Sequence, residues 1–164
     1  MDNSIEIRTA KKEDVHLILS FIKELAEYEH LAQEVVATEE MLTESLFGKD
    51  SITEVLLAYY NNKPVGFALF FHNFSTFLGR KGIYLEDIYV KPQYRGKGIG
   101  KALLVKLAKI AKERNCGRLE SAVLNWNKAA IEFFESLGAI PMDEWRTYRM
   151  AGKSLTKLAD KSKS

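Results

Sequence analysis

Several residue types are scarce in this 164-residue sequence, and each scarcity excludes a class of protein. The single cysteine, Cys116, excludes an internal disulfide and fits a reducing compartment. The three histidines are far apart and show no metal-ligand spacing, so we expect no metal. The longest apolar run, Val65 to Phe71, is too short to span a bilayer. Asp2 and Glu6 stand where a signal peptide would be basic and then apolar. We therefore expect a cytoplasmic protein that does not insert into membranes.

The charge of the chain is small in total and uneven in distribution. The net charge is +2, yet residues 24–50 carry eight acidic side chains and one basic, and residues 91–118 carry nine basic and one acidic. This asymmetry suits two ligands of opposite charge, although both segments could simply be solvated helix faces. No basic run is interleaved with stacking aromatics, so binding to nucleic acid is disfavoured.

Strand and helix signals alternate along the chain without a linker or an internal repeat. Hydrophobic residues make up 46% and charged residues 28%, which is typical of a globular domain of this length. The periodicities predict strands at 5–9, 54–60, 64–73, 83–90, 118–124 and 145–150, and helices at 12–30, 38–48, 99–114 and 128–137. The prediction is an α/β fold with helices on both faces of a mixed sheet.

The stretch from Tyr84 to Gly100, YLEDIYVKPQYRGKGIG, combines an acidic apolar strand, a basic glycine loop and the start of a helix. Glycine lets the backbone approach an anion closely, and the first amides of a helix favour phosphate. The sequence therefore predicts a bound diphosphate. The predicted contacts are Arg95, Gly96, Lys97, Gly98, Ile99, Gly100 and Lys101.

Two commoner phosphate loops do not fit this stretch. A P-loop ending in Gly100 and Lys101 would need a glycine at position 95 and a hydroxyl at position 102, where the chain has Arg95 and Ala102. A dinucleotide fingerprint that starts at Gly96 would need its third glycine at position 101. Neither type of loop is present.

The remaining pattern, Gln93-x-x-Gly96-x-Gly98, resembles the acetyl-coenzyme A loop of the GNAT superfamily of N-acetyltransferases. FIKELAEYEHLAQEV at 21–35, YLEDIYV at 84–90 and WNKAAIEFFESLGA at 126–139 are similar to spermidine/spermine N-acetyltransferases and their thialysine-acetylating relatives. The resemblance implies an acetyltransferase domain over 5–152, a basic tail over 153–164, a mostly antiparallel sheet and a homodimer. It also implies acetyl transfer from acetyl-CoA to a primary amine of a small cationic metabolite.

Acetyl transfer to such an amine requires a proton acceptor. An alkylamine has a pKa of about 10.4, so at pH 7 about one molecule in two thousand is the neutral nucleophile. Glu86, on the strand that leads into the loop, is the candidate base, as the resemblance also implies. Asp87 would face the opposite side of a regular strand, which favours a structural role for it.

The resemblance also assigns residues to the two ligands. Backbone amides of Ile88, Tyr89 and Val90 are expected to contact pantetheine and to stabilise the oxyanion. On the last helix the expected cofactor contacts are Asn127, as its N-cap, and Ala130. The expected amine site comprises Tyr28 and Glu29 together with Glu86; a core-edge tyrosine and a surface glutamate are the alternative for the first two.

One residue departs from the family. Phe134 stands where the family has a tyrosine that protonates the leaving thiolate, and phenylalanine has no proton to give. Either the thiolate, with a pKa near 8.5, leaves unaided or with help from the helix N-terminus, or Tyr94, Tyr148 or water replaces the missing donor. Three functions remain open: a polyamine acetyltransferase, the same chemistry on a lysine analogue or an aminoglycoside, and a coenzyme A sensor without turnover.

Overall fold

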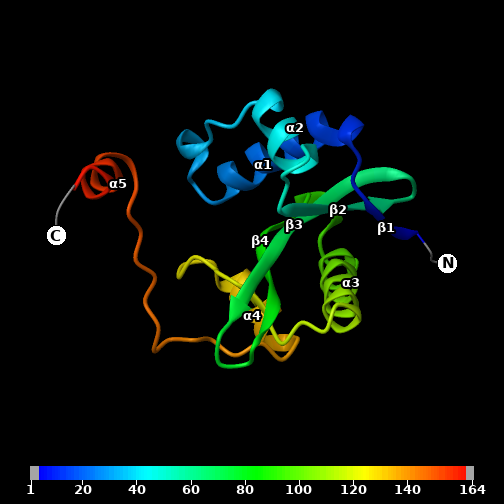
Figure 1. The fold of residues 1–164 in the computed structure, drawn as a ribbon. Helices are drawn as coiled ribbons and strands as arrows, with labels where there is room; N and C mark the ends of the chain where they lie inside the picture. The colour runs from blue at the N-terminus through cyan, green and yellow to red at the C-terminus, as the bar shows by residue number, and fades with distance from the viewer. Residues whose placement is uncertain (1–3, 162–164) are drawn as a thin grey trace. The chain divides into compact units, whose positions relative to one another are not determined.

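The computed structural model describes residues 4–161 and divides the chain into two compact units, Met1–Leu124 and Asn125–Ser164. The first unit is built on a five-stranded sheet whose strand order follows the sequence (Figure 1). Its strands are β1 (Ile5–Thr9), β2 (Thr53–Tyr60), β3 (Lys63–Ser75), β4 (Arg80–Val90) and β5 (Leu119–Ser121). The first four strands pair antiparallel, and β4 pairs with β5 parallel. The predicted mixed, mostly antiparallel sheet is confirmed.

Local sequence explains most element boundaries. The β2–β3 hairpin turns at Asn61 and Asn62, whose φ angles of 50° and 66° are those that a two-residue hairpin turn requires. Thr38 caps its helix by accepting a hydrogen bond from the Met41 amide at 3.1 Å. The helices of the first unit are α1 (Val15–Tyr28), α2 (Glu39–Phe47) and α3 (Ile99–Glu113), with 3₁₀ turns η1 (Lys12–Asp14), η2 (Ala32–Glu34) and η3 (Pro92–Tyr94).

Helices cover both faces of the sheet, as predicted. In Figure 1, α1 and α2 lie on one face and α3 on the other. The core under α1 joins side chains of this helix to alternate residues of the strands: Ile18, Phe21, Leu25, Val55, Leu57, Phe67, Leu69 and Tyr89. The buried stripe of α3 comprises Ile99, Leu103, Leu104, Leu107, Ile110 and Ala111. The strand β4 lies between these two layers, and the loop that follows it leads into α3.

The end of β4 is fixed by a close approach of two backbones. Gly66 of β3 pairs with Val90, and a Cβ atom at Gly66 would lie 2.4 Å from the carbonyl oxygen of Tyr89. No side chain fits there without moving β4. A glycine inside a strand is the usual sequence signal for such an approach, and Gly66 therefore belongs to the residues that position the loop.

The second unit contains α4 (Lys128–Ser136) and α5 (Gly152–Ala159). Asn127 caps α4, as predicted, because its Oδ1 accepts from the Ala130 amide at 3.2 Å. The predicted strand at 145–150 is wrong, since this segment has no regular secondary structure and pairs with no described strand. Alternation in a sequence marks a face that could be buried, whereas a strand also needs an edge to pair with. The strand predicted at 118–124 is confirmed only at its centre, β5.

The C-terminal segment differs from a featureless tail. Helix α5 covers part of the region expected to be a basic tail, and its side chains are exposed. Residues 162–164 lie outside the described residues. Within residues 4–161, no helix combines the length and the apolar character that crossing a membrane would demand.

Candidate active site

The glycine loop adopts a backbone that only glycine favours. Gly96 and Gly98 have φ angles of 81° and 86°, and a Cβ atom on either would meet nothing within 4 Å. Glycine is required there by the left-handed backbone, and the space beside it is open. Gly100 lies in the first turn of α3 and does not share the left-handed backbone of Gly96 and Gly98.

The start of α3 presents unsatisfied amides. The first helical hydrogen bond runs from the Ala102 amide to the Gly98 carbonyl at 3.0 Å, and the N-cap residue, Gly98, has no side chain with which to cap the helix. In an α-helix the amides before that bond have no intrahelical acceptor. The amides of Ile99, Gly100 and Lys101 are therefore available donors at the positive end of the helix dipole.

Two loop cations rest on aromatic rings. The guanidinium carbon of Arg95 is 4.7 Å from the ring centroid of Tyr28 and 5.7 Å from that of Tyr89. The ammonium of Lys97 is 5.5 Å from the ring centroid of Tyr60. Such stacking adds positive charge to the loop while keeping each cation in place.

Backbone groups of β4 are available beside the loop. Strand β5 pairs with β4 only from Ile83 to Leu85. From Glu86 to Val90, the edge of β4 that faces away from β3 has no strand partner among the described residues. Tyr89 is 6% exposed, its ring lies in the core, and it pairs with Phe67 of β3. Because the Lys91 amide donates to the Val65 carbonyl, the antiparallel register turns the backbone groups of Tyr89 toward β3. The backbone groups of Ile88 and Val90 face the open edge. This edge can bind an extended polar chain such as pantetheine.

The predicted orientation of Asp87 is wrong, because a β-bulge at Glu86 interrupts the strand. Asp87 pairs with Leu69, whereas the next pair joins Phe70 to Leu85, so Glu86 has no partner. Paired residues share a face, and Leu69 belongs to the core under α1. Asp87 therefore lies on the α1 face. Glu86, which follows Leu85 of the opposite face, lies there too. The regular alternation on which the prediction depended is interrupted by one residue.

The bulge creates a carboxylate cluster. Burial, followed by repulsion from Glu86 and Glu29, raises the pKa of Asp87 from 3.8 to about 7. Burial also raises the pKa of Glu29, the half-buried residue that ends α1. Two carboxylates within electrostatic reach of Asp87, whose pKa is near neutrality, make this cluster a candidate site for a cation.

The two residues of the predicted amine-binding pair, Tyr28 and Glu29, contact different parts of the site. Glu29 interacts with Asp87, as expected of a residue in an acidic site. The ring of Tyr28 instead stacks on Arg95 of the phosphate loop. The end of α1 therefore contacts both the loop and the carboxylates.

The remaining predicted residues lie in the second unit. Asn127 is 8% exposed and caps α4, and Ala130 supplies the amide that it caps. Phe134 lies on the same helix with its ring 5.4 Å from that of Phe133. Of the alternative proton donors, Tyr148 is 83% exposed, and Tyr94 packs on Tyr60 in the first unit with 5.7 Å between ring centroids.

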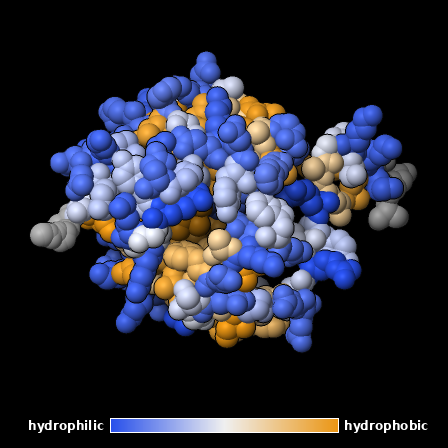
Figure 2. Space-filling model, turned by 180° about the vertical axis from the view of Figure 1, so that it is seen from behind, coloured by the Kyte–Doolittle hydropathy of each residue, from blue (hydrophilic) through white to orange (hydrophobic). Residues whose placement is uncertain are grey.

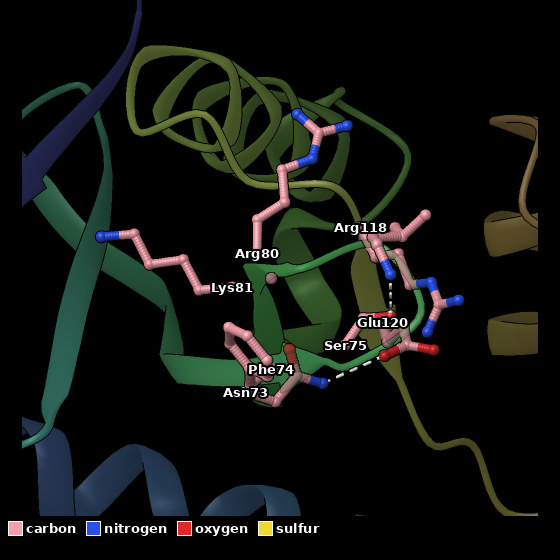
Figure 3. Close-up of a pocket in the computed structure, with 9 residues that line it drawn as sticks. Asn73, Phe74, Ser75, Arg80, Lys81, Arg118 and Glu120 are labelled. Carbon is pink, nitrogen blue, oxygen red and sulfur yellow. Dashed lines mark hydrogen bonds between the residues drawn. The ribbon is translucent and has the colours of Figure 1, made fainter.

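Surface hollows also lie outside the carboxylate cluster. An open groove of about 440 Å³ borders the start of α3 and is lined by Ile7, Gly98, Lys101, Ala102, Val105, Lys106 and Lys109. Its lysines extend the positive surface of the loop. Figure 3 shows a much smaller pocket at the tip of the β3–β4 hairpin, where Asn73 donates to Glu120 at 3.0 Å. Its volume of about 10 Å³ has room for a water molecule at most.

Comparison with known proteins decides the family. The profile of the acetyltransferase (GNAT) family matches residues 18–139. The chain belongs to the GNAT family. It is similar to a thialysine N-epsilon-acetyltransferase of Bos taurus, with 41% identity over 96% of this chain and 98% of the relative. It is also 42% identical to an L-ornithine N5-acetyltransferase of Arabidopsis thaliana, over 66% of this chain and 45% of that one.

A solved structure agrees with this assignment. An integron cassette protein from the mobile metagenome of V. cholerae has a TM-score of 0.80 and 33% identity, over 98% of this chain and all of that one. This GNAT protein is an N-acetyltransferase, as the sequence predicted. Sequence reasoning missed two of its features, the part of Asp87 in the acidic cluster and the close approach at Gly66. Only the glycine had a signal in the sequence.

Proposed function

We propose that this GNAT enzyme acetylates the side-chain amine of a cationic amino acid, a lysine analogue such as thialysine, with acetyl-CoA as donor. The observation that carries the proposal is the carboxylate cluster of Glu29, Glu86 and Asp87 on the α1 face of β4. The similarity to thialysine and ornithine acetyltransferases favours an amino acid over a polyamine as acceptor.

The cofactor would be held mainly by backbone groups. Loop and helix amides from Gly96 to Lys101 face the diphosphate, and Arg95 and Lys97 add charge. The unpaired edge of β4 from Ile88 to Val90 donates to pantetheine and to the thioester oxygen as it becomes an oxyanion. The contacts predicted for Asn127 and Ala130 rest on the resemblance to the family and stay a prediction.

Proton removal is the task of the carboxylate cluster. The substrate amine arrives protonated, and making it neutral at pH 7 costs about 4 to 5 kcal/mol. Glu86 is the proposed acceptor, directly or through water, and Asp87 is a second acceptor whose pKa of about 7 suits a general base. Glu29 remains the proposed partner for the charge of the substrate.

The transfer step then needs one bond exchange. The amine nitrogen attacks the thioester carbonyl carbon, the C–N bond forms, and the C–S bond breaks with its electron pair on sulfur. The amine proton passes to the carboxylate. Because Phe134 has no proton to donate, coenzyme A leaves as the thiolate, for which a thiol pKa near 8.5 is tolerable.

The proposal is tested by following free thiol while acetyl-CoA is incubated with thialysine, ornithine and spermidine. We expect kcat/KM for thialysine to exceed that for spermidine by about tenfold or more, the size of difference that one unpaired buried polar group produces. If kcat/KM for spermidine exceeds that for thialysine by the same factor, the proposal is wrong and the acceptor is a polyamine. An aminoglycoside in the panel tests the remaining acceptor class.

The absence of the family's tyrosine at Phe134 favours one other function, a coenzyme A sensor without turnover. A sensor has no use for two carboxylates beside the thioester, so the cluster of Glu86 and Asp87 argues for the enzyme. Stabilisation by coenzyme A in a thermal shift, with no thiol released for any amine, would favour the sensor.

We also propose a cytoplasmic homodimer. The single cysteine supports a reducing compartment. Apolar residues gather in places on the largely hydrophilic face drawn in Figure 2. Large apolar side chains are exposed at the β3–β4 tip and in the C-terminal segment: Phe74, Phe77, Ile140, Met142, Trp145 and Met150. Such surface is typical of an interface, and sedimentation at micromolar concentration would show a mass of twice 18.7 kDa.

A further inference from the structure

Arg95 is the most constrained cation of the phosphate loop. Its Nε donates to the Val90 carbonyl at 2.9 Å, and its guanidinium lies over the rings of Tyr28 and Tyr89. These contacts come from β4 and from the end of α1. An exposed arginine would otherwise lose about 2 kcal/mol of rotamer entropy when it binds a phosphate. A side chain that is already held in place loses less of it.

The helix that carries Tyr28 is itself held against the sheet. Glu24, one turn earlier on α1, accepts from the Tyr89 hydroxyl at 2.8 Å and from the Lys91 ammonium at 3.0 and 3.1 Å. One turn before that, Phe21 stacks on Phe67 with 5.7 Å between ring centroids. Residues 21, 24 and 28 share one face of the helix. The last two turns of α1 are thus tied to the end of β4, from which the loop begins.

The stacked arrangement leaves the two terminal nitrogens of the Arg95 guanidinium available to bind a phosphate. The bond to Val90 engages only Nε, and the two terminal nitrogens carry four further N–H groups. Stacking uses the face of the guanidinium plane, whereas bidentate contact with a phosphate uses its edge. Both interactions can therefore be made together.

We propose that Tyr28 is a positioning residue for the cofactor: its ring orients Arg95 toward the diphosphate of acetyl-CoA, and it does not bind the amine. The proposal rests on the proposed function and replaces the amine-binding role that the sequence suggested for Tyr28. Glu29, the next residue, keeps its place in the carboxylate cluster. The end of α1 then serves the two substrates through two adjacent residues.

The test compares Tyr28→Leu with the conservative Tyr28→Phe by calorimetry with coenzyme A and by steady-state kinetics. We expect Tyr28→Leu to raise Kd for coenzyme A and KM for acetyl-CoA by about fivefold to tenfold. The KM for thialysine, measured at saturating acetyl-CoA, stays within about twofold. Tyr28→Phe keeps the ring and restores the affinity. A raised KM for the amine with an unchanged Kd for coenzyme A would overturn the proposal.

Two further variants distinguish a specific effect of Tyr28 on Arg95 from a nonspecific effect of losing an aromatic side chain. Tyr59→Leu removes a similar contact elsewhere, since the Arg8 guanidinium carbon lies 3.9 Å from the Tyr59 ring centroid. It should leave Kd for coenzyme A within about twofold. Combining Tyr28→Leu with Arg95→Met should weaken binding no more than Arg95→Met alone, because Tyr28 acts through Arg95. Additive losses, or an equal loss from Tyr59→Leu, would overturn the positioning role.

The proposed function can fail separately. If the wild-type protein does not bind coenzyme A, both proposals fall. If the wild-type protein binds it and Tyr28→Leu binds it equally well, only the role of Tyr28 is overturned.

Discussion

Replacing Asp87 with asparagine should stabilise this protein at neutral and alkaline pH. The folded state raises the pKa of Asp87 from 3.8 to about 7, chiefly by burial and then by repulsion from Glu86 and Glu29. Between these two values the folded protein binds more protons than the unfolded chain. Stability contributed by this group is therefore complete below pH 4 and is lost as the pH rises to 7.

The size of the effect follows from the pKa. A rise from 3.8 to about 7 corresponds to at most about 4 kcal/mol. Water that reaches the carboxyl group reduces this, so we expect Asp87→Asn to raise the free energy of unfolding by about 1 to 3 kcal/mol at pH 8. At pH 4, where Asp87 is neutral in the folded state, the variant and the wild type should be nearly equal.

Urea unfolding at pH 4, 5, 6, 7 and 8 measures this difference directly. Asp143→Asn, which removes an exposed carboxylate, is the matched control and should follow the wild-type curve. Parallel curves for Asp87→Asn and the wild type would refute the reasoning, because the pH dependence would then originate elsewhere. The same substitution should lower kcat, since it removes a proposed proton acceptor.

Three other substitutions, with Gly138→Ala as a control, probe the leaving group, the strand end and the loop. Phe134→Tyr should raise turnover at pH 7 in a coenzyme A release assay, since it restores the family's proton donor; an unchanged or lower rate counts against this. Gly66→Ala should lower the free energy of unfolding in urea by about 1 to 3 kcal/mol, because its Cβ meets the Tyr89 carbonyl, and wild-type stability would contradict that close approach. Gly98→Ala and Gly138→Ala should each cost about 1 kcal/mol of backbone strain, as both glycines have positive φ. Only Gly98→Ala should weaken coenzyme A binding in calorimetry. Equal affinities of the two variants for coenzyme A would contradict the proposal that the glycine loop binds its diphosphate.

Features set by neighbouring residues in the chain could be predicted from the sequence. Thr38 and Asn127 cap helices as expected, and the Asn61–Asn62 hairpin turn has the backbone that these residues favour. The glycine loop likewise follows a strand and opens a helix. In each case the cause lies within a few residues of the effect.

Features set by a partner strand could not be predicted. The bulge that turns Asp87 toward α1 depends on how β4 is registered against β3, and no glycine or proline at positions 85–87 marks it in the sequence. The segment 145–150 has the composition of a strand but pairs with no strand among the described residues. The contact between Tyr28 and Arg95 joins residues 67 positions apart, which no local pattern records.

The central claim is that amides and cations from Arg95 to Lys101 bind the diphosphate and so place the thioester beside Glu86 and Asp87. Calorimetric titration with coenzyme A and with pantetheine, which lacks the diphosphate, tests it most directly. We predict that coenzyme A binds about a hundredfold more tightly or better, as several charge-assisted hydrogen bonds to phosphate require. Equal affinities for the two ligands, or no binding of coenzyme A at all, would contradict the account.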